Sequence, residues 1–183
     1  MSVYNKLVKF RERTRNAFAQ IDVQLERRHD LIPNLVETVK GYMGHEKDTL
    51  EAVVNARAAA TQAQAMEKMA SSEGALGGAL SRLLAVSEAY PDLKANQNMA
   101  QLTEELTTTE NKIAFARQNY NDQVSTYQTY KTTFPPVVFA NMFGFGDSAY
   151  LDLDEKTHKR ENINVSFDDE ANPFPPQTGG LRD

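Results

Sequence analysis

Hydrophobic residues recur at alternating intervals of three and four positions along most of the chain, which is the pattern of amphipathic helices. We predict a first helix over residues 3–28, followed by a tight reversal at His29–Asp30. A second helix is predicted over residues 30–69, with Pro33 in its first turn. A proline is tolerated there, because the N–H that it lacks would have no partner within the helix.

The middle of the second helix is its least secure part. Gly41 and Gly44 each cost about 1 kcal/mol relative to alanine, so they mark either a close approach of two helices or a break before residue 45. A third helix is predicted over residues 72–90, with Ser72 as its N-cap. A fourth, over residues 99–132, has the most regular spacing of hydrophobic residues.

Four helices joined by short connections favour an all-α fold, an elongated antiparallel (up-down-up-down) four-helix bundle. We assign this bundle to residues 1–134. Residues 135–167 are expected to pack on it, with a short helix at residues 137–143 and a strand or extended segment at 161–167. Residues 168–183 are acidic and then rich in proline and glycine, which predicts a disordered tail.

Composition excludes several classes of protein. The 183 residues include no cysteine, so there is no disulfide framework and no thiolate metal site, although the compartment stays open. The formal net charge is −5 and the isoelectric point is about 5.3, which argues against a nucleic-acid-binding protein. No hydrophobic run reaches the ~18 residues of a membrane span, and no signal-peptide pattern is present.

Several blocks of sequence stand out along the chain: YNKLV, NAFAQIDVQLERRHDLIPNLVETVKGY, HEKDTLEAVVNAR, RLLAVSEAYPDLKAN, ELTTTENKIAFARQNYND and a run of the form FP…FA…FGF. Together these blocks resemble the LemA family of bacterial proteins. They occur in family order between Tyr4 and about Phe167. The resemblance implies a long antiparallel helical bundle with no established enzymatic activity, and therefore no catalytic residue and no cofactor.

Members of this family typically carry one N-terminal membrane helix immediately before the position of YNKLV. The present sequence starts at that position. The resemblance therefore leaves two interpretations open: an anchor that precedes Met1, or a member of the family that has no anchor.

Two groups of residues are candidate contacts with a membrane or a partner. Basic residues close to a membrane exit favour the cytoplasmic side and are attracted to anionic headgroups. Their alternative role is an ordinary solvated helix face. Aromatic residues near the C-terminal end of the bundle form either an end-cap or an exposed hydrophobic patch. The candidates are Lys6, Lys9, Arg11, Arg13 and Arg15, and Phe139, Phe143 and Phe145.

No catalytic, cofactor-binding or metal-binding residue is assigned from the sequence. Glu26-x-x-His29 and Glu155-x-x-His158 have the spacing used in di-iron bundles, but we interpret the match as coincidence because the remaining ligands are missing. Charged residues also lie on or beside the hydrophobic stripes. They are interpreted as inter-helix ion pairs, or alternatively as the lining of a polar cavity: Asp22, Arg28, Glu37, Glu46, Arg57, Arg82, Glu88, Glu110 and Arg117.

The sequence and the family resemblance together predict a non-enzymatic protein of the bacterial cell membrane, with its bundle on the cytoplasmic side. We expect it to act as a scaffold or protein-interaction module, with an unidentified protein partner or with a second copy of itself, and not with nucleic acid. Two alternatives remain: a metal-binding or small-ligand-binding bundle of the enzyme class, and a membrane-surface sensor.

Overall fold

A computed structural model describes residues 2–151 of the chain. These residues contain no β-strand, so the predicted all-α class is confirmed for this part. The extended segment predicted at residues 161–167 and the tail at 168–183 lie outside the described residues. The helices are α1 (Val3–Lys40), α2 (Lys47–Gln62), α3 (Met66–Ser87), α4 (Pro91–Lys94), α5 (Gln97–Thr132) and α6 (Pro136–Met142).

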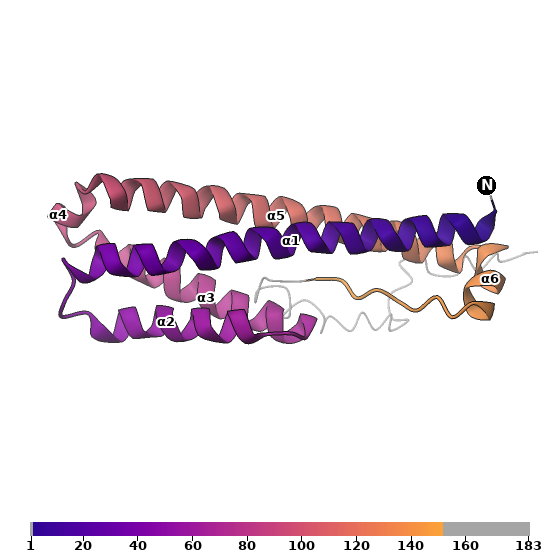
Figure 1. The fold of residues 1–183 in the computed structure, drawn as a ribbon, viewed down its shortest axis with the longest axis horizontal. Helices are drawn as coiled ribbons and strands as arrows, with labels where there is room; N and C mark the ends of the chain where they lie inside the picture. The colour runs from indigo at the N-terminus through magenta and orange to yellow at the C-terminus, as the bar shows by residue number, and fades with distance from the viewer. Residues whose placement is uncertain (1, 152–183) are drawn as a thin grey trace, which may run out of the picture.

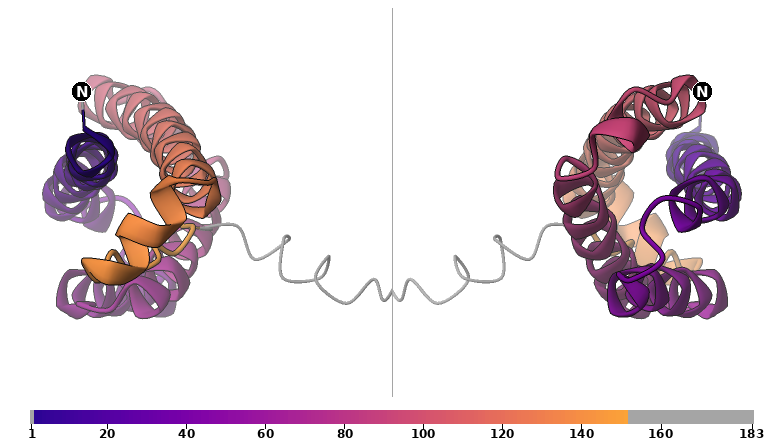
Figure 2. Two further views of the ribbon diagram at one scale, coloured as in Figure 1. Left: turned by 90° about the vertical axis from the view of Figure 1, so that its right-hand side faces the viewer. Right: turned by 90° about the vertical axis from the view of Figure 1, so that its left-hand side faces the viewer.

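The two longest helices, α1 and α5, run antiparallel and side by side over their whole length (Figure 1). With 38 and 36 residues, each is roughly 55 Å long at 1.5 Å per residue. The shorter helices α2 and α3 form a hairpin that covers only the half of this pair where α1 ends (Figures 1 and 2). At the other end, beside the N-terminus, α6 packs on both long helices. The α2–α3 hairpin therefore flanks half of the molecule, and α6 with the segment after it flanks the other half.

The predicted reversal at His29–Asp30 is wrong, because α1 continues through Pro33 to Lys40. A proline inside a helix leaves the carbonyl four residues earlier without its N–H donor. Here that carbonyl belongs to His29, and the Nε of Arg57 in α2 donates to it at 2.8 Å. A side chain of the neighbouring helix thus satisfies the backbone group that Pro33 leaves unpaired.

The first reversal occurs instead at residues 41–46, around the two glycines at which the sequence predicts either a close approach or a break. The predicted boundary at Ser72 is also wrong, since α2 ends at Gln62 and α3 begins at Met66. Ser72 lies inside α3, where its hydroxyl donates to the carbonyl of Lys68 at 2.7 Å instead of capping a helix. The predictions for α5 and α6 agree with the structure to within about two residues.

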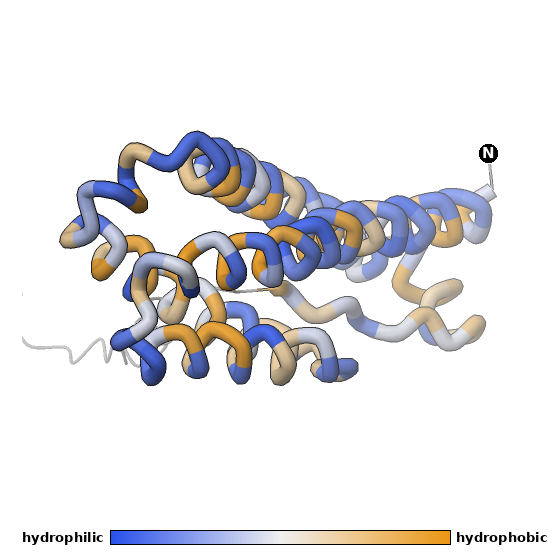
Figure 3. The backbone as a smooth tube through the Cα atoms, turned by 60° about the vertical axis from the view of Figure 1, so that its left-hand side comes forward, coloured by the Kyte–Doolittle hydropathy of each residue, from blue (hydrophilic) through white to orange (hydrophobic). Residues whose placement is uncertain are grey.

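Buried hydrophobic side chains form three clusters along the length of the molecule. Each long helix alternates hydrophobic and hydrophilic residues, as expected for a helix with one buried face (Figure 3). The first cluster joins α1 to α2, α3, α4 and the start of α5, with Leu35 and Leu76 among its fully buried members. The second lies between α1 and α5 and includes Leu151, and the third packs Leu7 and Tyr127 against the α6 end.

Leu35 is fully buried in the first cluster. We expect Leu35→Ala to lower the free energy of unfolding by about 2–5 kcal/mol, because it removes buried methyl groups and leaves a cavity. The measurement is urea unfolding followed by circular dichroism. Val23→Ala on the same helix is the control: Val23 is 58% exposed, so its change should stay within about 0.5 kcal/mol. Equal losses for the two variants would contradict the described packing of α1.

Candidate functional site

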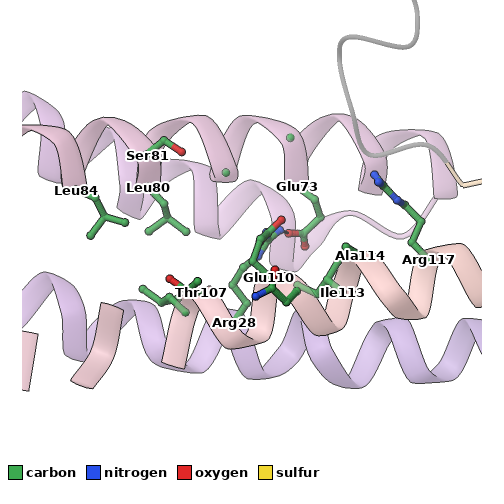
Figure 4. Close-up of a pocket in the computed structure, with 14 residues that line it drawn as sticks. Arg28, Glu73, Leu80, Ser81, Leu84, Thr107, Glu110, Ile113, Ala114 and Arg117 are labelled. Carbon is green, nitrogen blue, oxygen red and sulfur yellow. Dashed lines mark hydrogen bonds and ion pairs between the residues drawn. The ribbon is translucent and has the colours of Figure 1, made fainter. Parts of the chain in front are cut away.

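A buried arginine in α1 pairs with carboxylates from two other helices. The guanidinium of Arg28 donates to Glu73 of α3 and, at 2.6 Å, to Glu110 of α5 (Figure 4). The side chains of Arg28 and Glu73 are 4% and 1% exposed, whereas Glu110 is 61% exposed. Buried charges are tolerated only when they are paired, and this contact links three helices.

The neighbouring residue extends this ion-pair network. The Nε2 of His29 donates to the second oxygen of the Glu73 carboxylate at 2.7 Å, while its backbone carbonyl accepts from Arg57. Four helices therefore meet at one level of the fold: α1 supplies Arg28 and His29, α2 supplies Arg57, α3 supplies Glu73 and α5 supplies Glu110.

The environment of Glu73 changes its proton affinity. Burial alone would raise the pKa of this carboxyl, because it disfavours the charged form. The hydrogen bond from His29 and the positive charge of Arg28 act in the opposite direction and together outweigh burial, so the pKa of Glu73 is held below its ordinary value. Glu73 is therefore ionised and acts only as a hydrogen-bond acceptor at neutral pH.

A pocket of about 480 Å³ opens between α3 and α5, with the ion-pair network at one side (Figure 4). One wall is α3, where Gly74 and Gly77 carry no side chain and leave space for an occupant. A Cβ atom added at Gly77 would meet nothing within 4 Å. The other residues that line the pocket are Arg28, Glu73, Leu80, Ser81, Leu84, Leu106, Thr107, Glu110, Asn111, Ile113, Ala114 and Arg117.

The chemistry that this pocket offers is mainly hydrophobic contact together with charge pairing. Two carboxylates engage Arg28, and its Nε has no hydrogen-bond partner among the described residues. No group of three or more His, Asp or Glu side chains that could hold a metal ion occurs within residues 2–151. His29 bonds to Glu73, and Glu26, its partner in the Glu-x-x-His spacing, is exposed on α1. Glu155 and His158 lie outside the described residues.

The five basic candidates all lie on the first half of α1. Lys6, Lys9 and Arg13 share one side of the helix, because they are spaced by three and four residues. Arg11 and Arg15 lie on another side. There the guanidinium of Arg11 lies over the ring of Phe145, with 5.2 Å between the Cζ atom and the ring centroid. The structure therefore divides the basic run into two rows.

The three aromatic candidates differ in exposure. Phe145 is 8% exposed and belongs to the third hydrophobic cluster, and Phe139 is half-buried against the same cluster. Phe143 is 54% exposed and makes an edge-to-face contact with Tyr4, their ring centroids 5.1 Å apart. Large exposed side chains also gather on this end of the molecule, the α6 end: Tyr4, Phe134, Val138, Met142 and Phe143.

The most buried acid of the ion-pair network is absent from the sequence-based candidates. The sequence places Glu73 at the very start of the helix predicted over residues 72–90, directly after the expected N-cap, whereas this residue lies inside α3 on the face that holds Leu76 and Leu80. The spacing of these residues, three and then four positions, could have identified Glu73 as a buried residue. Arg57 is among the charged residues predicted on a hydrophobic stripe, but its role depends on α1 continuing through Pro33.

The sequence model of the LemA family matches residues 17–167, a range that includes the whole ion-pair network and the pocket. The chain belongs to the LemA family. This result confirms the resemblance found in the sequence, and the matched range extends 16 residues past Leu151, the last described residue.

Several relatives of this LemA-family chain are magnetosome proteins. The chain is 26% identical over 174 residues to magnetosome proteins MamQ 1 and MamQ 2 of Paramagnetospirillum magneticum. It is 24% identical to magnetosome protein MamQ of Magnetospirillum gryphiswaldense. Each match covers 81% of this chain and 64% of the relative's own length, so the chain spans less than two thirds of these relatives.

The first test of the ion-pair network removes its cation. We expect Arg28→Met to lower the free energy of unfolding by about 3–5 kcal/mol, because the Glu73 charge stays buried without its partner. Arg27→Met is the matched control, since Arg27 is 52% exposed and 4.0 Å from Glu105; it should cost less than about 1 kcal/mol. Urea unfolding measures both, and similar losses would contradict a special role for Arg28.

The second test uses acid. A carboxyl whose pKa is lowered in the folded state stabilises the fold fully above its unfolded-state pKa, about 4.3 for glutamate, and loses that contribution as the pH falls through the folded-state value. We therefore expect the difference in stability between the wild type and Glu73→Gln to shrink between about pH 6 and pH 3. Urea midpoints across this range measure it. A difference that grows with acidity would reverse the assigned pKa direction.

Proposed function

We propose that this chain is a non-catalytic, membrane-associated LemA-family protein whose α6 end contacts the bilayer while the rest of the molecule extends away from it. Membership in the family and similarity to magnetosome proteins support the membrane association. Among residues 2–151, no helix is both long and hydrophobic enough to cross a bilayer. The association proposed for the described part is therefore a surface contact.

One observation carries the proposal: exposed hydrophobic and basic side chains occur together at a single end of a long molecule. Phe134, Met142 and Phe143 are 84%, 64% and 54% exposed. The rows Lys6–Lys9–Arg13 and Arg11–Arg15 begin within the first turns of α1, which starts at the same end (Figure 1). Hydrophobic side chains that enter the interface and cations that meet anionic headgroups are the two usual components of binding at a membrane surface.

The family resemblance implies an N-terminal membrane anchor. Such an anchor would join α1 at Val3, on the end that carries the hydrophobic and basic residues. The five basic residues would then lie close to the membrane exit, which favours the cytoplasmic side. We include this anchor and this orientation in the proposal.

The remainder of the molecule is proposed to serve as a scaffold for other proteins. Its long helices expose mainly polar side chains, and Arg28 of α1 pairs with Glu110 of α5 as well as with the buried Glu73 of α3. A rigid polar surface of this length suits protein docking, either by an unidentified partner or by a second copy of the chain. No enzymatic step is required of any residue in this proposal.

The membrane contact is tested with vesicles. We expect the 183-residue protein to bind vesicles of anionic lipid at low salt, and the combined variant Lys6→Gln, Lys9→Gln and Arg13→Gln to bind about 100-fold more weakly. This factor corresponds to about 1 kcal/mol for each basic residue near the surface. Co-sedimentation or flotation measures the binding.

A matched control changes the same number of charges at the opposite end of the molecule, with Lys40→Gln, Lys47→Gln and Lys94→Gln. These three residues are exposed near the α1–α2 turn and α4, and their loss should leave binding nearly unchanged. Binding that is equal in all three proteins, or that does not weaken with added salt, would overturn the proposed contact.

A further inference from the structure

The stretch of chain that contains α6 carries no charge. Residues 132–146, which we call the uncharged loop, include no Asp, Glu, Lys, Arg or His. The two charged residues that bound this loop, Lys131 and Asp147, form an ion pair with each other. Because an unpaired charge is costly to remove from water, this composition suits a segment that enters an apolar environment.

Side chains of α5 hold the base of the uncharged loop and the chain that follows it. Three of them donate hydrogen bonds to carbonyl groups of residues 146–151: Tyr127 to Gly146 at 2.9 Å, Tyr120 to Ala149 at 2.8 Å and Asn121 to Leu151 at 3.0 Å. The loop is therefore a closed element that is fixed to the end of α5.

The helix α6 lies across the long axis of the molecule and is hydrophobic on two sides (Figures 1 and 2). On its inner side Pro136 and Ala140 are buried, and Phe139 packs against the third cluster. On its outer side Val138 and Met142, one turn apart, are 53% and 64% exposed. A helix that is hydrophobic on both sides is normally buried, so the outer side of α6 indicates an apolar partner.

Two phenylalanines extend this outer side beyond both ends of α6. Phe134 precedes the helix and Phe143 follows it, and both are more than half exposed. We call Phe134, Val138, Met142 and Phe143 the loop face. An exposed hydrophobic patch of this kind marks a surface that binds a membrane or another protein.

The charges beside the loop face favour a lipid surface over a second copy of the chain. The Nζ of Lys6 lies over the ring of Tyr130, 5.9 Å from its centroid, which keeps a cation next to the base of the loop. Lys9 and Arg13 continue the row along α1. A symmetric contact between two copies at this end would bring the basic rows of both to one interface, whereas anionic headgroups are complementary to them.

We propose that the uncharged loop inserts into the boundary between headgroups and acyl chains, with Phe134, Val138 and Met142 among the lipid. Helices of this kind lie in the plane of the membrane with their hydrophobic side submerged. Because α6 lies across the long axis, α1 and α5 then stand upright on the bilayer. This inference rests on the proposed membrane contact and adds the residues that enter the lipid and the orientation of the molecule.

The absence of tryptophan from the chain allows a direct test. Phe134→Trp and Met142→Trp each place one tryptophan on the loop face, and Phe115→Trp is the control, since Phe115 is 72% exposed within α5. The three proteins are mixed at low salt with anionic vesicles whose acyl chains carry bromine, which quenches tryptophan on contact. We expect the fluorescence of the two loop variants to be quenched and shifted to shorter wavelength, and that of the control to stay unchanged.

Each other outcome has a distinct meaning. Proteins that co-sediment with the vesicles while neither loop tryptophan is quenched would overturn insertion but leave the proposed surface contact standing. Wild-type protein that does not bind these vesicles would overturn both. Quenching of Phe115→Trp as strong as that of the loop variants would mean that the molecule lies along the membrane, which contradicts the upright orientation. A shift to shorter wavelength without vesicles that grows with protein concentration would place a second copy on the loop face.

A second measurement needs no tryptophan. We expect the double variant Phe134→Ser, Met142→Ser to bind anionic vesicles at least about tenfold more weakly than the wild type, because two large hydrophobic side chains no longer leave water. Both residues are exposed, so their replacement leaves the core intact. Phe115→Ser is the control and should bind as the wild type does. Equal binding of the double variant and the wild type would also contradict insertion.

Discussion

The structure depends on the buried pairing of Arg28 with Glu73. A guanidinium and a carboxylate that have both lost their water are costly unless they meet in good geometry, so burial of both groups requires α1 and α3 to keep this contact. The adjacent His29 connects this pair to α2, because its carbonyl is the one that Pro33 leaves without a donor and Arg57 supplies the replacement. Within one turn of α1, the buried charge of Arg28 is paired with Glu73 of α3, and the carbonyl of His29 accepts a hydrogen bond from Arg57 of α2.

Two long helices with unequal neighbours give the molecule two different ends. The end beside the α2–α3 hairpin contains the largest hydrophobic cluster and exposes mostly polar side chains. The other end is covered by α6 and the segment that follows, and it exposes several aromatic and aliphatic side chains. This difference between the two ends is the physical basis for the proposal that one end contacts the membrane and the rest docks other proteins.

Hydrophobic periodicity predicts the helices whose boundaries are determined by local sequence. It fails where a contact between residues distant in sequence determines the boundary. The helices α5 and α6 are predicted well because the hydrophobic spacing of α5 is regular and Pro135 and Pro136 separate the two helices. The continuation of α1 through Pro33 does not follow from local sequence, since it depends on Arg57, which is 28 positions from the carbonyl it serves. Glu73 escapes prediction for a related reason: the serines and the glycine around it are typical of a turn, and they outweigh its position on the face of Leu76. For the candidate site, Arg28 and Glu110 are therefore predicted as charges near the core, whereas Glu73 is missed although its spacing from Leu76 and Leu80 places it on the buried face of α3.

The contacts between α5 and residues 146–151 have a consequence for how this region can vary. Tyr120, Asn121 and Tyr127 bind only main-chain groups of the segment, so they recognise the spacing of peptide units and not the identity of the side chains. Replacement of Asp147 or Ala149 changes none of these bonds, whereas one added or deleted residue shifts every carbonyl out of reach. The spacing of these α5 side chains therefore sets the number of residues in this stretch. We expect natural variants to differ here in residue identity but not in length.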